Sequence, residues 1–255
     1  MRTVIKLGGR TQTAADVIPV LAKAWAESGR SLCLVHGGGD EISLVQSMMG
    51  REPVFVNGRR ITTAEDMEVV RMVLSGSANK RLVAALVSIG VPAVGVSGED
   101  AGMIIAQPVD ADKFGRMGTV TSIRPELIET LLSAGYLPVI SPVACDETVA
   151  AGAAMNVNGD DAAAAIAGAL GADLVMVADV EGVLDASGAA VESLDPAMMH
   201  DMIASGEVAG GMRAKLEAGF AALAAGACTA RIGSLAAIAD IDRGTTLVLT
   251  SASVG

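Results

Sequence analysis

The segment Ser31-Leu-Cys-Leu-Val-His-Gly-Gly-Gly-Asp-Glu-Ile42 joins a short apolar run to three consecutive glycines and then to a stretch with helical patterning. A short apolar run of this kind is typical of a strand buried on both faces, and the pattern after the glycines predicts a helix over Asp40–Met49. A strand, a glycine turn and a helix in succession form the unit of an α/β fold. Open α/β sheets bind ligands at the carboxyl ends of their strands, so we expect the chemistry of this protein to lie in such turns.

The same alternation extends over most of the chain. The predicted strands are Thr3–Leu7, Ser31–Val35, Ala93–Val96, Leu137–Ile140, Leu174–Val177 and Thr246–Leu249. The predicted helices are Ala14–Ser28, Asp40–Met49, Thr63–Ser88, Pro125–Ala134, Asp160–Leu170, Pro196–Ala204 and Met212–Ala225. Glycine and proline punctuate short extended pieces between Ile104 and Ser122, which predicts a hairpin or an excursion from the main sheet. The whole pattern predicts an α/β fold, a three-layer α/β/α sandwich around a mainly parallel open sheet.

Domain organisation follows from length and from the order of these elements. The 255 residues suit one large α/β domain, and no Pro/Ser-rich linker divides them. A strand restarts at Leu174 after a long Ala-rich helix, which places a soft boundary near Gly171. We therefore expect a single domain over residues 1–255 with two lobes, 1–172 and 173–255.

Composition argues against several classes of partner. Asp and Glu outnumber Lys and Arg 29 to 18, for a net charge of −11, and only 2% of the residues are aromatic. Neither property suits nucleic-acid binding, which needs surplus positive charge and aromatic stacking. The most apolar stretch, 162–178, is interrupted by Asp173 and falls short of the apolar length that a bilayer requires. We expect neither a nucleic-acid nor a membrane partner.

Cysteine and histidine usage bears on the compartment and on metal binding. Cys33, Cys145 and Cys228 lie far apart in apolar or small-residue contexts, as reduced thiols of a cytoplasmic protein do. With two histidines and no cysteine cluster, we expect no metal held by protein ligands of the zinc type.

Two glycine-rich turns are candidate anion sites. Lys6-Leu-Gly-Gly9 follows the first predicted strand, and His36-Gly-Gly-Gly39 follows the second. Successive glycines let backbone N–H groups converge on an anion, and a following helix N-terminus adds partial positive charge. Neither turn matches the P-loop or the dinucleotide-binding motif, because no Lys-Ser/Thr follows the glycines and Ile42 stands where a third spaced glycine would be. The alternative is a tight turn without a ligand, although three glycines in a row exceed what a turn needs.

Lysine is scarce, and two lysines adjoin glycine-rich segments. Lys6 lies inside an apolar strand, where its charge is costly unless it has a partner. An ammonium acts as a point charge on phosphoryl oxygens, which favours a functional reading. For Lys215, in Gly210-Gly-Met-Arg-Ala-Lys215, a solvated position in the first turns of a helix is an equal alternative.

Three further segments carry candidate ligands. The run Asn156-Val-Asn-Gly-Asp-Asp161 opens a predicted helix; helix capping is the alternative, but capping needs one such residue and the run supplies four. Alternation about Val157 places Asn156 and Asn158 on one side of an extended segment. Arg60 is a candidate carboxylate clamp, with a solvated arginine as its alternative. The strand-end loop that begins at Asp179 is a candidate site or a plain turn.

Together these segments resemble the amino acid kinase family. The similar segments, which occur in the family's order from Val4 to about Gly233, are Lys6–Gly9, His36–Gly39, Gly58–Thr62, Asn79–Lys80, Gly95–Asp100, Asn156–Asp160, Asp179–Leu184 and Gly210–Lys215. Three residues depart from the family's usual pattern. Thr63 stands where members usually carry Asp, Gly159 replaces the usual Ala, and Glu99 is unusual in its segment.

Within the family, the motifs are similar to those of members that use ATP to phosphorylate the γ-carboxylate of N-acetyl-L-glutamate in arginine biosynthesis. A kinase for carrier-protein-linked 2-aminoadipate in lysine biosynthesis and a non-catalytic amino-acid sensor are the alternatives. The resemblance implies an acyl-substrate and dimerisation lobe over 1–172 and a nucleotide-binding lobe over 173–255. It also implies that Mg²⁺ arrives with ATP rather than in a protein cage.

The resemblance further assigns roles to single residues. The implied catalytic residues are Lys6, Lys215, Asp160 and Gly9. The implied substrate-binding residues are Gly37, Gly38, Arg60, Asn156 and Asn158. The implied nucleotide-binding residues are Lys6, Asp179, Val180, Gly182, Val183, Leu184, Gly211 and Lys215. In these roles the two lysines neutralise the transferring phosphoryl group, Asp160 orients them, and Arg60 with Asn156 binds the α-carboxylate and acetamide.

The sequence also bears on the oligomeric state of the protein. Arginine-inhibited members of the family carry an additional helix before the first strand, and here the first predicted strand begins at Thr3. A stripe at Met67, Val70, Val73 and Leu74 could bury a face against a twofold mate or pack on its own subunit. We expect a homodimer that is insensitive to L-arginine.

Overall fold

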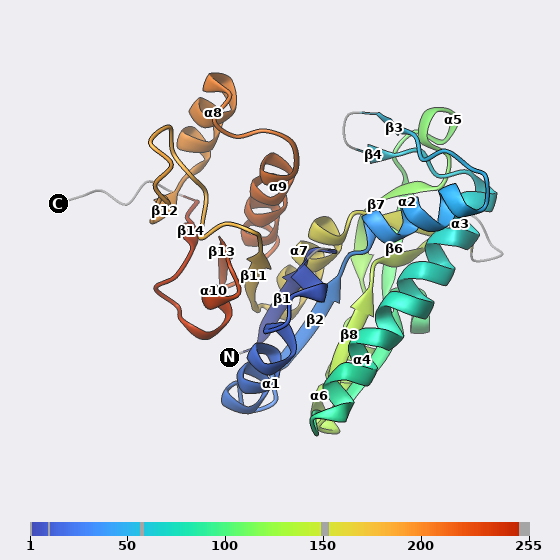
Figure 1. Cartoon of the computed structure of the whole chain (residues 1–255), viewed down its shortest axis with the longest axis horizontal. Helices are drawn as coiled ribbons and strands as arrows, with labels where there is room; N and C mark the ends of the chain where they lie inside the picture. The colour runs from blue at the N-terminus through green and yellow to red at the C-terminus, as the bar shows by residue number, and fades with distance from the viewer. Residues whose placement is uncertain (1, 10, 57–58, 149–152, 250–255) are drawn as a thin grey trace.

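The computed structural model describes residues 2–9, 11–56, 59–148 and 153–249. The strands of its main sheet are β1 (Thr3–Leu7), β2 (Leu32–His36), β5 (Ala93–Ser97), β8 (Leu137–Ser141), β11 (Asp173–Val177), β12 (Ser193–Leu194), β13 (Thr229–Gly233) and β14 (Thr245–Leu247). Their order is β12-β14-β13-β11-β1-β2-β8-β5. The six strands from β13 to β5 run parallel, and β14 pairs antiparallel with β13. Figure 1 shows β1 and β2 at the centre of the molecule, between the C-terminal elements and those of residues 39–157.

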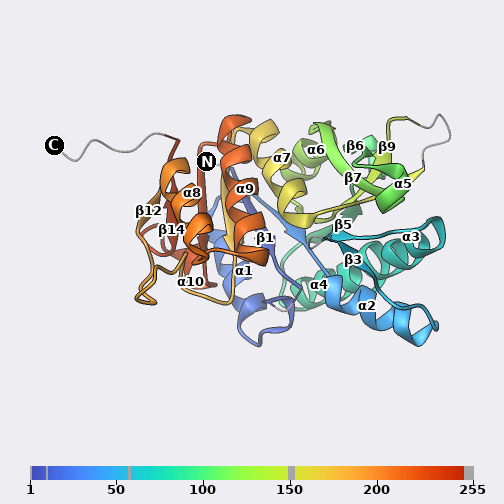
Figure 2. The same ribbon diagram turned by 90° about the horizontal axis from the view of Figure 1, so that it is seen from above.

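Helices cover both faces of this sheet. The α-helices among the described residues are α1 (Val17–Glu27), α2 (Gly39–Met48), α3 (Ala64–Arg71), α4 (Asn79–Ser88), α5 (Ala111–Phe114), α6 (Glu126–Ser133), α7 (Gly159–Leu170), α8 (Pro196–Ser205), α9 (Gly210–Ala224) and α10 (Ala236–Ala239), with short 3₁₀ turns at Thr11–Thr13 and Asp100–Gly102. Helices α6, α7 and α9 line one face, and α1 and α4 lie on the opposite face (Figure 2). The predicted three-layer α/β/α fold with a mainly parallel sheet is confirmed.

The alternation of side chains along β1 explains both the core and the position of the site. Val4 belongs to the core cluster beneath α7 and α9, whereas Ile5 and Leu7 belong to the cluster beneath α1 and α4, and all three are fully buried. Because successive residues of a strand point to opposite faces, Lys6 points to the α7 face. Fully burying an aliphatic side chain stabilises the fold by about 1.5–3 kcal/mol, so these runs fix the register of the central strand.

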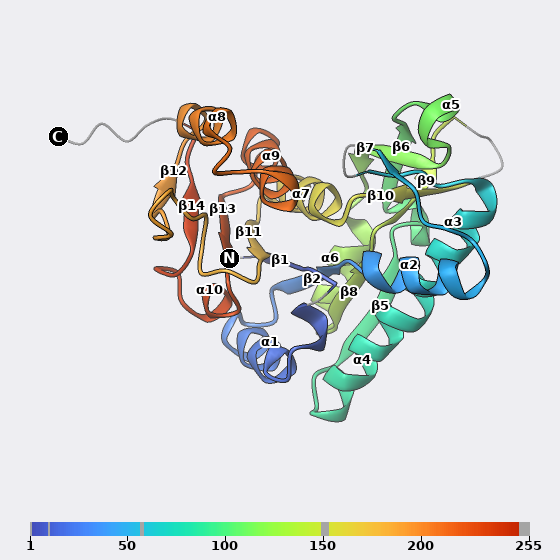
Figure 3. The same ribbon diagram turned by 45° about the horizontal axis from the view of Figure 1, so that its top comes forward.

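A second, smaller sheet lies at the opposite end of the molecule from β12 and β14 (Figure 3). Its strands are β6 (Ile104–Pro108), β7 (Met117–Ile123), β9 (Val143–Asp146) and β10 (Ala154–Val157), which close on one another in the order β10-β7-β6-β9. The predicted hairpin is confirmed, because β6 and β7 pair antiparallel. A short hairpin of β3 (Phe55–Val56) and β4 (Arg59–Arg60) lies beside it.

The predicted single helix over residues 63–88 is three helical segments in the structure. A π-helix over Met72–Ala78 separates α3 from α4. The stripe of Met67, Val70, Val73 and Leu74 is buried within this chain, in a core cluster that includes Ile42. The alternative in which the stripe packs on its own subunit is therefore confirmed, and the stripe provides no surface for a twofold mate.

Within the described part of the chain, the helices are too short or too polar to span a lipid bilayer.

Candidate active site

The two glycine turns meet at the carboxyl ends of β1 and β2. The N–H of Gly37 donates to the carbonyl of Leu7 at 3.0 Å, which joins the turns directly. A Cβ atom on Gly38 would lie 2.7 Å from Cδ2 of Leu74, closer than real contacts, so Leu74 could approach this turn only because residue 38 has no side chain. Helix α2 begins at Gly39, immediately after the turn, and its N-terminus adds partial positive charge there.

Lys6, Asp160 and Lys215 form one cluster of charges between the turns and the helices above them. The Lys6 Nζ lies 2.8 Å from Asp160 Oδ1, and the Lys215 Nζ lies 3.1 Å from the same oxygen and 3.2 Å from Oδ2. Lys6 comes from β1, Asp160 from the first turn of α7 and Lys215 from α9. Side-chain exposure is only 8%, 9% and 15%, so the solvated alternative for Lys215 is wrong.

Burial and pairing shift the ionisation of this cluster. Burial lowers the pKa of Lys6, and the nearby Asp160 carboxylate only partly opposes that shift. Burial by itself would raise the pKa of Asp160, but the charges of Lys6 and Lys215 outweigh it and hold the pKa below its usual value. The carboxylate therefore stays ionised at neutral pH and holds two ammonium groups on one side of α7.

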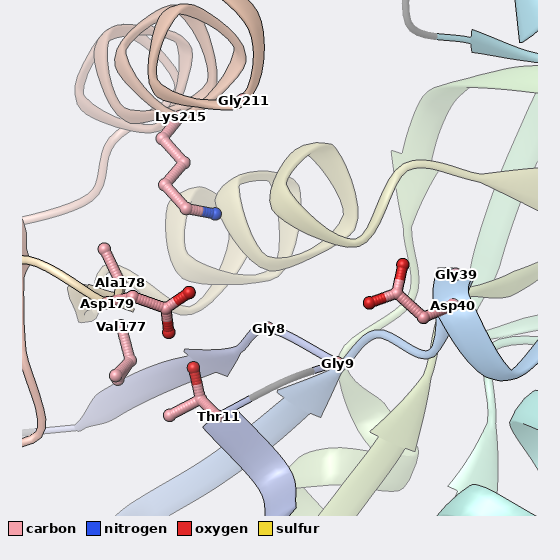
Figure 4. A pocket seen from close by; sticks show the side chains of 10 residues that line it. All are labelled: Gly8, Gly9, Thr11, Gly39, Asp40, Val177, Ala178, Asp179, Gly211 and Lys215. Carbon is pink, nitrogen blue, oxygen red and sulfur yellow. The ribbon is translucent and has the colours of Figure 1, made fainter.

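One pocket opens beside Lys215. Its volume is about 330 Å³, and its lining residues are Gly8, Gly9, Thr11, Gly39, Asp40, Val177, Ala178, Asp179, Gly211 and Lys215. Figure 4 shows the Lys215 amine pointing in from α9, with Asp179 near it and Asp40 across the pocket. Gly9, Asp179, Gly211 and Lys215 were predicted from the sequence. Thr11 and Asp40 were missed, although each lies within two residues of a glycine turn, which was the available signal.

Five predicted nucleotide residues lie outside the lining of this pocket, and one of them is Lys6. Val180, Gly182, Val183 and Leu184 follow Asp179 in the chain. The side chain of Val183 is fully buried in the core, and its N–H donates to Thr245 Oγ1 at 2.8 Å. The structure thus gives Val183 a packing role, and its nucleotide role stays a prediction.

A second pocket is lined by Lys6 and adjoins the first pocket at Gly9 and Gly39. Its volume is about 270 Å³, and its lining residues are Lys6, Gly9, Gly37, Gly38, Gly39, Ile42, Phe55, Arg59, Arg60, Leu74, Met117, Pro142, Asn156, Val157, Asn158, Gly159 and Asp160. All the predicted substrate residues are among them. The apolar wall of Phe55, Met117 and Pro142 was missed, because these residues come from segments whose tertiary pairing carried no local pattern.

The two asparagines of this pocket differ in their bonding. Asn156 Nδ2 donates to Thr62 Oγ1 at 3.0 Å, which orients the amide from β10. Asn158 caps α7, because its Oδ1 accepts from the N–H of Asp160 at 2.7 Å. The capping alternative thus holds for Asn158, which lines the pocket at the same time.

Arg60 is buried in this pocket and is not a solvated arginine. Its Nη2 donates to the Gly39 carbonyl at 2.8 Å and to Ser43 Oγ at 2.7 Å, and its Nη1 donates to Gln46 Oε1. The guanidinium also stacks over Phe55, with 4.6 Å between Cζ and the ring centroid. Burial lowers the pKa of Arg60, against the more distant charges of Asp66 and Asp40.

His36 and Asn79 hold the second glycine turn in place through hydrogen bonds. The ring Nδ1 of His36 lies 3.0 Å from the Gly37 carbonyl, and Nε2 lies 3.1 Å from Asn79 Nδ2. Because a carbonyl only accepts and an amide nitrogen only donates, the imidazole is neutral with its proton on Nδ1. Burial lowers the pKa of His36 to about 4, which keeps it neutral at physiological pH.

The departures from the family pattern have structural partners. Thr63 caps α3 and forms a capping box with Asp66. Glu99 accepts from Nε and Nη2 of Arg71 at 3.1 and 2.8 Å. A Cβ on Gly159 would lie 3.3 Å from Cε of Lys6, so the absence of a side chain there gives this lysine room.

Metal ligands are a separate question. Across residues 2–9, 11–56, 59–148 and 153–249, three or more His, Cys, Asp or Glu side chains never gather into a group that could hold a metal ion.

Comparisons with known proteins agree with this arrangement. Residues 1–234 match the model of the amino acid kinase family. The chain is 44% identical to an acetylglutamate kinase of Methanopyrus kandleri, over 95% of this chain and 98% of the other. It is 42% identical to an acetylglutamate kinase of Chloroflexus aurantiacus, over 93% and 94% of the two chains. A crystal structure of smu.665 from Streptococcus mutans UA159 superposes with a TM-score of 0.85 at 28% identity, covering 97% of this chain and 98% of that one.

At the carboxyl ends of a parallel sheet, two buried lysines thus lie at two adjoining pockets, Lys215 at the first and Lys6 at the second. The chain belongs to the amino acid kinase family.

Proposed function

We propose that this protein is an acetylglutamate kinase, which transfers the γ-phosphoryl group of ATP to the γ-carboxylate of N-acetyl-L-glutamate. The observation that carries the proposal is the position of Lys6, Asp160 and Lys215 at two adjoining pockets. One pocket has room for phosphates beside Lys215, and the other presents Arg60 and Asn156 to an acyl amino acid. The two relatives reported above share this assignment.

The reaction requires little covalent chemistry from the protein. The attacking carboxylate is already ionised at neutral pH, so no general base is needed, and catalysis is positioning plus neutralisation of charge. Lys6 stands between the pockets, where it contacts the transferring phosphoryl oxygens. Lys215 lies on the nucleotide side, where it stabilises the charge that develops on the leaving phosphate. Asp160 holds both ammonium groups in place and is a positioning residue.

Backbone N–H groups supply the remaining donors. The turns at Gly9 and at Gly37–Gly38 line the acyl pocket next to Lys6, and their donors are fixed before substrate binds. Donors held in position lower the barrier more than donors that must reorganise during the reaction. The glycines thus complement the charge that Lys6 begins to neutralise.

In this proposal Mg²⁺ enters with ATP. The nucleotide pocket presents the carboxylates of Asp40 and Asp179, too few to form a protein cage for the ion. Mg²⁺ commonly keeps several waters and binds substrate phosphates, so the described residues fit an ion carried by the nucleotide. When bound, the ion screens phosphate charge.

The test is an ATP and Mg²⁺ assay in which hydroxylamine traps the acyl phosphate. N-acetyl-L-glutamate, glutamate, aspartate and 2-aminoadipate derivatives, including a carrier-protein-linked form, are compared in parallel. We expect a hydroxamate with N-acetyl-L-glutamate at a kcat/KM well above the others. Preference for the carrier-linked derivative would identify the 2-aminoadipate alternative, and ligand binding without turnover would identify a sensor.

The homodimer and the cytoplasmic location remain predictions. Light scattering of the purified protein tests the first, and a hexamer would contradict it. Cell fractionation tests the second.

A further inference from the structure

Arg60 carries a buried charge whose contacts are all neutral. Its three acceptors are a carbonyl, a hydroxyl and an amide oxygen, those of Gly39, Ser43 and Gln46. Arg60 as a whole is 6% exposed, and within the described residues it forms no ion pair. A buried guanidinium is costly unless an anion compensates it. The charge of Arg60 is therefore available to an anion that enters the pocket.

The nearest carboxylate in this network is Asp66, and Gln46 stands between the two. Gln46 lies on α2 and is 1% exposed. Its Nε2 donates to Asp66 Oδ1 at 2.9 Å, while its Oε1 accepts from Arg60. An ionised carboxylate only accepts and a guanidinium only donates, so the amide can adopt one orientation alone. Gln46 thus connects the two charges without letting them pair.

Asp66 is already satisfied by other groups. Arg51 Nε donates to Asp66 Oδ1 at 2.8 Å, and the hydroxyl and N–H of Thr63 donate to Oδ2 at 2.9 and 3.2 Å. The negative charge of Asp66 is therefore balanced by Arg51, at the outer side of the network. A second carboxylate next to Arg60 would instead neutralise the positive charge inside the pocket.

We propose that Gln46 is a positioning residue that sets substrate choice. It holds the Arg60 guanidinium toward the acyl pocket and, being neutral, reserves its charge for the α-carboxylate of the substrate. This inference rests on the proposed function and extends it: the preference for an acyl amino acid with a free α-carboxylate depends on a side chain that does not line the pocket.

The decisive variant is Gln46→Glu, which keeps size and shape, adds a charge, and loses the hydrogen bond that Gln46 Nε2 donates to Asp66 Oδ1. The new carboxylate would pair with Arg60 in a buried site, where a charge-assisted bond is stronger than a neutral one. Gln46→Met is the comparison, because it removes both hydrogen bonds and adds no charge. Ser47→Ala is the matched control on the same helix, since Ser47 is exposed and faces away from this network.

The readout is discrimination between N-acetyl-L-glutamate and 4-acetamidobutanoate, which has the reacting carboxylate and the acetamide but lacks the α-carboxylate. We expect Gln46→Glu to lower the ratio of their kcat/KM values by about tenfold or more, through a higher KM for N-acetyl-L-glutamate with the KM for ATP unchanged. Gln46→Met should lower the ratio by about threefold, because the charge of Arg60 stays free. Ser47→Ala should leave the ratio unchanged.

Several outcomes would overturn the inference. An unchanged ratio in Gln46→Glu, or a larger loss in Gln46→Met than in Gln46→Glu, would refute the charge argument. If Gln46→Glu fails to fold by circular dichroism, an unchanged ratio in Gln46→Met refutes the positioning role. A wild-type protein that does not phosphorylate N-acetyl-L-glutamate would instead refute the proposed function. Calorimetric titration of wild type and Gln46→Met with N-acetyl-L-glutamate measures binding without turnover, so it tests this inference separately from the proposed function.

Discussion

Replacing Asp160 with asparagine should destabilise the protein and change how stability depends on pH. Asp160 is the carboxylate between Lys6 and Lys215, at 2.8 and 3.1 Å. Asparagine has nearly the same shape but no charge, so the variant retains packing and leaves two ammonium groups buried without a counter-ion. The perturbation therefore isolates the electrostatic part of the cluster.

The magnitude follows from burial. Removing one partner of a buried ion pair costs about 3–5 kcal/mol, because the remaining charge is desolvated and unpaired. In a chain of this size 1 kcal/mol shifts Tm by about 2–4 °C, so Asp160→Asn should lower Tm on the order of 10 °C. ATP should restore more Tm in the variant than in the wild type, because its phosphates replace the lost anion and no longer face a carboxylate.

The pH dependence has a defined sign. Burial lowers the pKa of Lys6, and loss of Asp160 lowers it further. A lysine whose folded pKa lies below its unfolded value of about 10.5 binds fewer protons when folded, so stability rises as pH increases toward that value. The difference in stability between variant and wild type should therefore shrink from pH 7 to pH 10, as measured by urea denaturation.

Asp161→Asn is the matched control. Asp161 neighbours Asp160 on α7, but burial and then the Asp160 charge raise its pKa, so its carboxylate opposes folding at neutral pH. Asp161→Asn should leave Tm unchanged or raise it. Equal losses of Tm in the two variants, or a loss in Asp160→Asn that grows at high pH, would refute the electrostatic reasoning.

Three further outcomes are expected. Lys6→Ala and Lys215→Ala should each lower kcat about 100-fold with a smaller change in KM, and near-normal kcat in both would exclude the proposed mechanism. Arg60→Ala should raise the KM for N-acetyl-L-glutamate far more than that for ATP; the reverse in steady-state kinetics would assign Arg60 to the nucleotide. Burial lowers the pKa of His36 to about 4, below its unfolded value of about 6.5. The stability that neutral His36 contributes is therefore fully present above about pH 6.5, and up to about 3 kcal/mol of it is lost as pH falls through 4. Denaturation of wild type and His36→Gln at pH 7 and 4.5 should show this loss in the wild type alone.

The main sheet was predictable wherever a strand is buried on both faces. The runs at Thr3–Leu7 and Leu137–Ser141 are mainly apolar and almost entirely buried, because helices cover both sides of the sheet. Strand β13 (Thr229–Gly233) was missed because Arg231 and small residues break its apolar run. Strands β9 and β10 were missed because pairing with distant partners, rather than local pattern, makes them extended.

Site residues were predictable from the sequence where a polar or charged side chain does not suit the element that contains it. Lys6 in an apolar strand requires a partner, which the structure supplies as Asp160, but no spacing along the sequence names that partner. Gln46 gave no signal, because a glutamine on an amphipathic helix usually faces water and only the fold brings it against Arg60. Sequence patterns thus indicate which residues need partners, and tertiary structure selects them.

The distribution of charge also accounts for how an acidic chain would bind the two anionic substrates of the proposed function. The protein carries a net charge of −11, yet the centre of the site holds two lysines against one aspartate, and Arg60 lies beside it with neutral acceptors only. In the proposed function each surplus positive charge faces a pocket, one for the phosphates of ATP and one for the α-carboxylate of the acyl substrate. Holding these charges buried and uncompensated lowers the stability of the free protein, and substrate anions restore it, so binding energy is concentrated at the two points between which the phosphoryl group must pass.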